Sequence, residues 1–168
     1  MRKLLTVLVI IAIPLIYFLY MFQDDTPIVP PRIGQEPPLI RIGNVPLRVE
    51  VADTPALRER GLGGRDTLAP TEGMLFIFDK SDYHKIWMLD MKLVIDVIWV
   101  DEQFTVVDIK KELRPDTYPR IFEPKVPARF VIETNQNYTE SFGIKIGDKV
   151  TIPDDLIPED LKNTPEQQ

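Results

Sequence analysis

The stretch that decides the fold is residues 73–101, GMLFIFDKSDYHKIWMLDMKLVIDVIWVD. It contains two apolar runs, residues 73–78 and residues 94–100, and the second run holds a single acid, Asp96. Short apolar runs bounded by Gly and Asp are typical of strands that are buried on both faces. We therefore predict a sheet centred on this stretch, with Trp99 in its interior.

The segments on either side of this stretch predict more short strands and two short helices. Strands are expected at residues 40–45, 47–51, 104–109, 128–133 and 150–152, and helices at residues 55–60 and 135–142. Asp53 or Thr54 can cap the first helix, Pro55 suits its first position and Gly61 ends it. Residues 110–126 read as a loop laid over the core. The pattern favours a compact, mainly β domain, an antiparallel sandwich or barrel with one or two short helices.

The amino-terminal segment, residues 4–22, is uncharged and spans roughly 28 Å at ~1.5 Å per residue, as a bilayer core requires. Arg2 and Lys3 precede it and Asp24 and Asp25 follow it, so the positive-inside tendency places the amino terminus in the cytoplasm. A cleaved signal peptide is the alternative, but no small-x-small site follows the bulky exit sequence. We predict an uncleaved single-pass anchor, with the domain at the cell surface or in the periplasm.

The rest of the chain divides into a Pro-rich linker at 23–38, one folded domain at 39–152 and an acidic tail at 153–168 that we expect to be mobile. The absence of Cys excludes disulfides, thiolate nucleophiles and Cys-based metal sites. Net charge is −6, from 20 basic and 26 acidic residues. Such an acidic chain is not expected to bind nucleic acid.

Seven short blocks follow one another along the domain. They are TPA at 54–56, RGL at 60–62, GMLFIF at 73–78, WM at 87–88, IDVIWVD at 95–101, PARFVIE at 127–133 and GIKIGD at 143–148. In this order they closely resemble the domain of unknown function 192 family over residues 45–152. The resemblance implies a compact β-rich domain, often secreted or anchored, and implies no activity.

Three positions depart from that family pattern. Gly63 stands where Met is usual, Leu89 replaces a common Lys, and Val94 stands where Pro is usual. A role that depends on the Lys is therefore not expected of this chain.

Asp96 is the one charge inside a predicted core strand. A buried, unpaired carboxylate is costly, so we expect it to be paired or neutral. The candidate cations are Arg58, Arg60 and Arg65. The acid could also point to solvent or cap a turn. If it pairs with a cation, two interpretations follow, a structural Asp–Arg clamp between sheet and helix, or a catalytic carboxylate.

His84 is the single histidine and lies in the polar connection 79–85. It could act as a general base, with Asp82 and Asp90 close in sequence, but an exposed loop position is the commoner case. One His completed by carboxylates alone makes a poor metal centre, and we predict neither a metal nor a cofactor.

The candidate site lies where the end of the first helix meets the Trp87 segment. Its residues are Arg58, Arg65, Trp87, Met88, Asp90 and Asp96. Gly63 and Gly64 allow close backbone approach, Arg65 offers a planar fork for carboxylate or phosphate, and Trp87 offers a flat apolar face. Core packing by Trp87 and Met88 is the alternative interpretation.

Two functions from different classes remain open, and the sequence does not decide whether the protein is an enzyme. The first is a membrane-anchored, non-catalytic binding or scaffolding module of the cell envelope, for a small polar ligand, a glycan or an envelope protein. The second is an extracytoplasmic hydrolase that uses Asp90 or Asp96 with an Arg. No Ser/His/Asp order, nucleophile elbow, phosphate loop or calcium loop is visible in the sequence.

Overall fold

Short strands dominate residues 36–162, which are the part of the chain that this computed structural model describes. The strands are β1 Leu39–Ile42, β2 Val45–Ala52, β3 Glu72–Asp82, β4 Ile86–Trp87, β5 Ile95–Val100, β6 Val106–Leu113, β7 Ile121–Phe122, β8 Ala128–Asn135 and β9 Val150–Thr151. The helices are α2 Pro55–Arg60 and α3 Tyr138–Ser141, with 3-10 turns at Pro115–Thr117, Asp154–Leu156 and Glu159–Leu161. The prediction of a mainly β domain with one or two short helices is confirmed.

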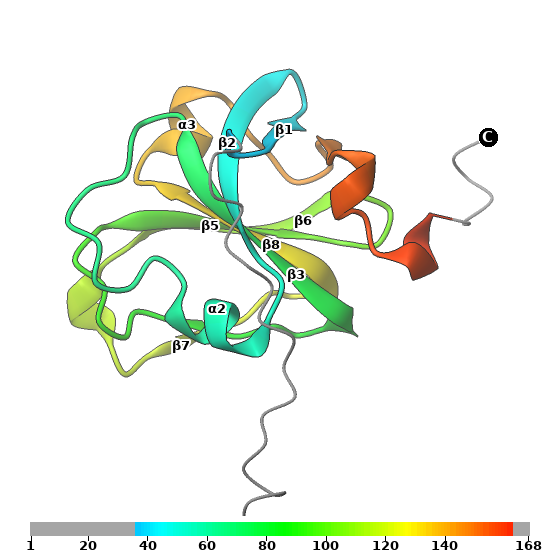
Figure 1. Cartoon of the computed structure of the whole chain (residues 1–168). Coiled ribbons are helices and arrows are strands. Elements are labelled where there is room, and N and C mark those ends of the chain that lie inside the picture. The colour runs from blue at the N-terminus through cyan, green and yellow to red at the C-terminus, as the bar shows by residue number, and fades with distance from the viewer. Residues whose placement is uncertain (1–35, 163–168) are drawn as a thin grey trace, which may run out of the picture. The chain divides into compact units, whose positions relative to one another are not determined.

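Seven of the strands form one curled sheet, a half-barrel, in the order β6-β5-β8-β3-β2-β1-β9 (Figure 1). The remaining two, β4 and β7, form a separate antiparallel ribbon. Most neighbours in the sheet are antiparallel, as predicted. The sequence left a sandwich and a barrel open as alternatives, and the observed sheet is a half-barrel.

One pairing departs from the antiparallel prediction, because β2 and β3 run parallel. Parallel neighbours need a crossover connection, and α2 together with residues 61–71 provides it. The helix begins at Thr54, whose Oγ1 accepts a hydrogen bond from the backbone N–H of Leu57 (3.3 Å). Pro55 takes the first helical position and Gly61 ends the helix at φ +50°, as the sequence predicts.

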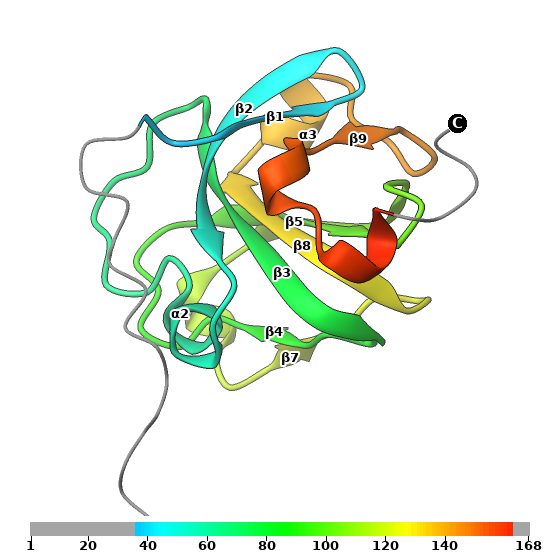
Figure 2. The ribbon, with the colours of Figure 1, turned by 45° about the vertical axis from the view of Figure 1, so that its right-hand side comes forward.

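The sheet carries apolar side chains on both faces, which we name the β1-side core and the α2-side core. Along β3 and β5 the residues alternate, so that Leu75 and Ile98 belong to the β1-side core and Phe76 and Trp99 to the α2-side core. Strands β1 and β9 and helix α3 cover one face, whereas α2 and the β4–β7 ribbon lie on the other (Figure 2). Two covered faces explain why both runs are continuously apolar, and Trp99 is fully buried as predicted.

The segment from Lys110 to Val126, expected as a loop over the core, is partly regular. Strand β6 continues to Leu113, and β7 pairs with β4, with Ile86 opposite Phe122 and Trp87 opposite Ile121. Phe122 is buried in the α2-side core, so the segment does cover that core.

Residues 153–162, the first part of the expected mobile tail, fold onto the β1-side core. Leu156 and Leu161 are each 6% exposed and belong to that core. The guanidinium of Arg129 donates to Asp160 Oδ1 at 2.8 Å. Residues 163–168 lie outside the described part of the chain.

No helix formed by residues 36–162 is long and apolar enough to cross a membrane. The predicted anchor at residues 4–22 and the linker up to residue 35 lie outside the described residues.

Candidate functional site

A pocket of about 290 Å³ opens beneath α2, between that helix, the start of β4 and the strands β3 and β8. Its lining comprises Pro55, Arg58, Glu59, Arg60, Gly61, Leu62, Phe76, Phe78, Lys85, Ile86, Trp87, Leu89, Met91 and Glu133. We refer to it as the α2 pocket. Most of the lining is apolar and aromatic, with a few charged groups among it, which is the usual make-up of a small-molecule site.

Glu133 is the buried acid of the α2 pocket. It belongs to β8, beside Met74 of β3 and Val97 of β5, so the sheet places its side chain with the α2-side core. The residue is only 5% exposed, and its Oε2 has no hydrogen-bond partner among the residues that the structure describes. Burial raises the pKa of Glu133 to about 7, although a hydrogen bond from the backbone of Leu62 and the charge of Arg65 act in the opposite direction.

Gly61 allows the backbone to pass close to this acid. A Cβ at position 61 would lie 3.3 Å from the ring of Phe76 and 3.5 Å from Glu133 Oε2, on backbone with a positive φ. Any side chain here would therefore crowd the floor of the α2 pocket and strain the helix end.

Arg58 is held rigidly in the wall of the pocket. Its Nη1 donates to the carbonyl oxygens of Asp53 and Ile77, both at 2.7 Å. Its guanidinium carbon lies 5.2 Å from the centre of the Phe78 ring, within the range of a cation–π contact. Arg58 therefore does not pair with Asp96, contrary to one of the predictions.

The charged groups around the pocket are mostly basic. Arg58, Arg60 and Lys85 are opposed by Glu59 and by the buried Glu133. Arg60, Lys85 and Glu59 are exposed, so they form the rim, while Glu133 lies at depth. The mouth of the α2 pocket thus favours an anionic group.

A second hollow adjoins the α2 pocket and shares Phe78, Lys85 and Trp87 with it. His84 lines this hollow and stacks on Phe78, with 3.5 Å between ring centroids and 9° between the planes. His84 Nε2 lies 3.0 Å from the carbonyl oxygen of Lys80, and partial burial lowers the pKa of His84. His84 does lie in a loop, as expected, but its ring is partly buried against Phe78 rather than fully exposed.

Of the six predicted site residues, the structure brings two to the α2 pocket, Arg58 and Trp87. Met88 is 1% exposed and packs in the α2-side core, which is the alternative interpretation for that residue. Trp87 is 40% exposed and lines both hollows.

Asp96 does not line the α2 pocket, and it is paired as expected, but its partners are not arginines. Its Oδ2 accepts hydrogen bonds from the Thr139 backbone N–H (3.0 Å) and hydroxyl (2.6 Å), and its Oδ1 accepts from the Glu112 N–H (2.9 Å). Glu112 has φ +54° where the β5–β6 register shifts, so Asp96 ties α3 to a bulge in β6. The expected arginine clamp failed because neutral N–H and O–H donors satisfy the buried carboxylate.

Arg65 forms a two-pronged ion pair with Glu50 of β2, and both side chains are partly exposed. This pairing raises the pKa of Arg65 and lowers that of Glu50. Arg65 therefore contributes charge near Glu133 without lining the α2 pocket.

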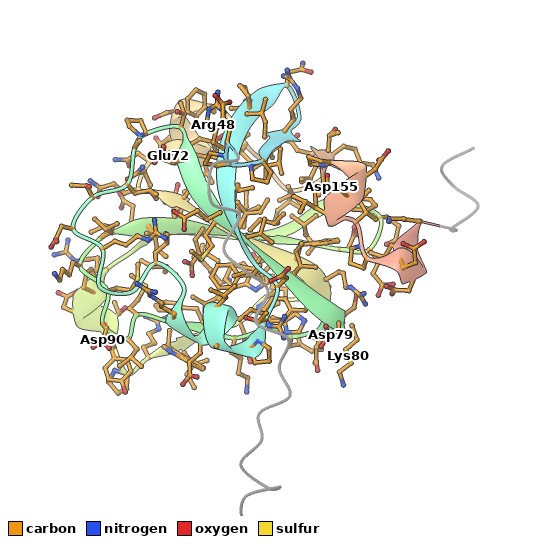
Figure 3. All side chains as sticks on the ribbon, in the orientation of Figure 1. Arg48, Glu72, Asp79, Lys80, Asp90 and Asp155 are labelled. Atoms are coloured by element: carbon orange, nitrogen blue, oxygen red, sulfur yellow. The ribbon has the colours of Figure 1, made fainter. Side chains whose placement is uncertain are left out.

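Asp90 is exposed among the peripheral loops, at φ +55° (Figure 3). Its carbonyl oxygen accepts the Gly64 N–H at 2.8 Å, which joins the two loops as the close approach at Gly63 and Gly64 predicts. A Cβ on Gly63 would come within 2.8 Å of the Arg60 carbonyl oxygen, so glycine is required there.

Glu133 was not among the predicted site residues, although its position in the sequence carried a signal. Glu133 directly follows the apolar run Phe130, Val131 and Ile132, an acid at the edge of a predicted core strand much as Asp96 lies inside one. Nothing in a single sequence says which of two buried acids has its partners. Among residues 36–162, His, Asp and Glu side chains do not gather in a group of three that could hold a metal.

Comparison with known proteins agrees with this fold. The profile of the DUF192 family, described as "Uncharacterized ACR", matches residues 39–152. The UPF0127 protein PH1112 of Pyrococcus horikoshii is 34% identical over 107 residues, which cover 61% of this chain and 84% of the relative. A UPF0127 protein of Thermococcus sibiricus is 33% identical over 110 residues, 61% of this chain and 64% of the relative.

Two crystal structures share the architecture. One, from Sinorhizobium meliloti and described as a candidate transcription regulator, has a TM-score of 0.65 and 27% identity, covering 71% of this chain and 98% of the other. The second, a protein of unknown function from Novosphingobium aromaticivorans, has a TM-score of 0.63 and 30% identity, covering 67% of this chain and 82% of the other. The fold, the matched residues and these relatives together place the chain in the DUF192 family, to which the UPF0127 proteins belong.

Proposed function

We propose that the domain is a non-catalytic binding module that takes a small ligand into the α2 pocket. The observation that carries the proposal is the buried Glu133 carboxylate, whose Oε2 lacks a partner among the described residues although it borders a pocket. A buried polar group without a partner costs free energy, about 1–3 kcal/mol and more for a charge. A ligand that supplies the missing donor would recover that free energy on binding.

The surroundings of Glu133 support a role in binding. Phe76 and Phe78 lie in the wall, and Arg58 is fixed by two backbone carbonyls. A rigid wall lowers the conformational entropy that a ligand must remove on binding. The partly exposed Trp87 offers a ring face at the entrance, where an aromatic contact adds apolar area.

Hydrolysis by Asp90 or Asp96 has weaker support. The three donors on Asp96 occupy its carboxylate on the β1-side face, away from the pocket, and Asp90 lies in an exposed loop. An acid–base mechanism requires both groups to reach one substrate. Binding is therefore the better-supported function.

The description of the Sinorhizobium meliloti structure as a candidate transcription regulator applies to that protein. For this chain, a net charge of −6 argues against direct binding to a nucleic-acid backbone. A regulatory role here would more readily act through a small ligand than through DNA contact.

Tethering to a membrane is part of the same proposal. Residues 4–22 are uncharged and follow Arg2 and Lys3, which supports an anchor with the domain outside the cytoplasm. In that arrangement the module would sample small molecules, glycans or proteins of the cell envelope.

The test is a thermal-shift screen of the purified full chain against amino acids, short peptides, sugars and nucleotides. A ligand of the native state raises the melting temperature by mass action. Glu133→Gln should abolish the shift produced by the best compound, while the exposed Glu72→Gln, with the same change in charge, should retain it. Shifts that survive Glu133→Gln, or a screen in which no compound shifts the melting temperature, would refute binding at this pocket.

A further inference from the structure

We propose that the ligand of the α2 pocket is a zwitterion with an apolar body, of the α-amino-acid class. Its ammonium group would pair with Glu133, and its carboxylate would lie among Arg58, Arg60 and Lys85. This inference rests on the binding function proposed above and specifies the ligand for the same site.

Glu133, at the floor of the pocket, would be best satisfied by a positively charged hydrogen-bond donor. The nearby Arg65 is committed to Glu50 through both prongs of its guanidinium, so it reaches Glu133 only through space. The backbone of Leu62 supplies a hydrogen bond to the carboxylate, which leaves Oε2 unpaired. An ammonium group brings three N–H donors and a full charge, and charge-assisted hydrogen bonds are about twice as strong as neutral ones.

The rim of the pocket favours a negatively charged group. Arg60 and Lys85 outnumber Glu59 there, and Arg58 adds a positive charge from the wall. Because Nη1 of Arg58 already donates to two carbonyls, the guanidinium is fixed in place. Its Nη2 lies 4.0 Å from the carboxylate of the exposed Asp79, and a ligand carboxylate would compete with Asp79 for it. A simple amine would be repelled by this rim, and a simple acid would meet Glu133 at the floor. A molecule that carries both groups satisfies both ends of the pocket.

The walls and the volume define the body of the ligand. Phe76, Phe78, Ile86, Trp87 and Met91 present apolar and aromatic surface. The pocket, at about 290 Å³, lies at the small end of the range of roughly 300–1,000 Å³ for ligand sites. This favours a molecule as large as phenylalanine, tryptophan, leucine or methionine over a nucleotide or an oligosaccharide.

The test is calorimetric titration of the full chain with L-phenylalanine, L-tryptophan, L-leucine and L-methionine. For the tightest of these, the analogues without the amine or without the carboxylate are titrated in parallel. We expect the amino acid to bind at least about tenfold more tightly than either analogue. Glu133→Gln should remove the advantage over the deaminated analogue, and Arg58→Gln should remove the advantage over the decarboxylated one.

The pH dependence supplies a further readout, because only ionised Glu133 pairs with an ammonium group. With the pKa of Glu133 at about 7, affinity for the amino acid should rise up to about tenfold between pH 6 and pH 8. The charged groups that face Glu133 are Arg65 from the loop after α2, Arg58, Glu59 and Arg60 from α2, and Lys85 before β4. His84 lines the adjoining hollow, stacks on Phe78 and also has a shifted pKa, so the titration is repeated with Glu133→Gln, in which the pH dependence of affinity should disappear.

Two outcomes would overturn the inference. If the deaminated analogue binds as tightly as the amino acid and its binding survives Glu133→Gln, the amine is not recognised. If all four amino acids fail to bind while another compound from the broader screen binds in a manner dependent on Glu133, the ligand class is wrong and the binding function stands. Glu72→Gln serves as the charge-matched control in each titration, with unchanged affinities expected.

Discussion

Asp96 and Glu133 lie on adjacent strands, one register position apart, and their side chains lie on opposite faces of the sheet. Asp96 is paired with Thr134 and Glu133 with Val97 across β5 and β8. Directly opposed residues share a face, and successive residues alternate. One acid is completely hydrogen-bonded within the fold, whereas the other has an unpartnered oxygen beside a pocket.

The first prediction concerns the pH dependence of stability. The pKa of Glu133 is about 7 in the folded chain against 4.5 for an ordinary Glu, so the folded state binds the proton more tightly. The resulting stabilisation is fully present below pH 4.5 and is lost as the pH rises through about 7. At pH 8 Glu133→Gln should therefore be more stable than the wild type by up to about 3 kcal/mol, at 1.36 kcal/mol per pKa unit.

Denaturant unfolding of both proteins at pH 5 and pH 8 measures that difference. Because the pKa of His84 is lowered in the folded chain, the contribution of His84 to stability increases as the pH rises. This contribution is the same in both proteins and cancels from their difference. The gap between them should shrink toward zero at pH 5. A gap that is the same at both pH values would contradict the raised pKa.

The second prediction separates Asp96 from ligand binding. Asp96→Asn replaces one of the two acceptor oxygens with an NH₂ donor, so the backbone N–H of either Thr139 or Glu112 faces a donor and loses its acceptor. We expect a loss of about 3 kcal/mol or more in the free energy of unfolding. The folded mutant should bind the pocket ligand with unchanged affinity, as measured by calorimetry below its melting temperature. Asp66→Asn, which affects an exposed ion pair with Lys92, should cost less than about 1 kcal/mol.

The third prediction concerns Arg65, whose partner is Glu50 rather than Asp96. Because both side chains are partly exposed, Arg65→Ala should cost no more than about 1 kcal/mol. A double-mutant cycle with Glu50→Gln should give a coupling of the same size, reduced by added salt. A loss of 3–5 kcal/mol, as expected for a stranded buried charge, would show that Arg65 serves a deeper acid.

The fourth prediction concerns Trp99, whose indole Nε1 donates to the His84 carbonyl oxygen at 2.9 Å. Trp99→Ala should cost about 3–5 kcal/mol through the cavity it leaves. Trp99→Phe keeps an aromatic ring of smaller size and loses the indole N–H, and the lost hydrogen bond alone should cost about 1–2 kcal/mol. Amide hydrogen exchange across residues 83–85 should rise in Trp99→Phe, because that bond ties this loop to the core.

The fifth prediction tests the proposed anchor. The full chain should fractionate with membranes, and protease added from the extracytoplasmic side should reach the domain. Mass spectrometry of the extracted protein should find residues 4–22 still attached. A mature chain that starts near Gln23 would indicate a cleaved signal peptide instead.

Much of the fold was readable from the sequence because local patterns agree with it. The apolar runs gave β3 and β5, Thr54 and Pro55 gave the start of α2, and Gly61 gave its end. The parallel pairing of β2 and β3 was missed, since strand alternation carries no information about the direction of a neighbour. The β4–β7 ribbon was missed because two-residue strands have no period to detect.

The candidate site was only half predictable, for a different reason. Arg58 and Trp87 were found because a helix end and a nearby aromatic residue are close in the expected topology. Asp96 was predicted on the face of the sheet that carries the pocket, but it lies on the opposite face. Which face it occupies depends on the strand register and on where α3 packs. Glu133 could be recognised only when its partners were counted in three dimensions.

The packing of residues 153–162 also bears on where the domain ends. The family match stops at residue 152, yet Leu156 and Leu161 complete a hydrophobic layer, and Asp160 neutralises Arg129, which is only 3% exposed. A recombinant fragment trimmed to the family boundary would expose apolar surface and leave the buried Arg129 guanidinium with Glu102, 4.0 Å away, as its ion-pair partner. Expression designs for this protein should therefore extend at least to Lys162, and aggregation of shorter fragments would reflect the trimming rather than an unstable fold.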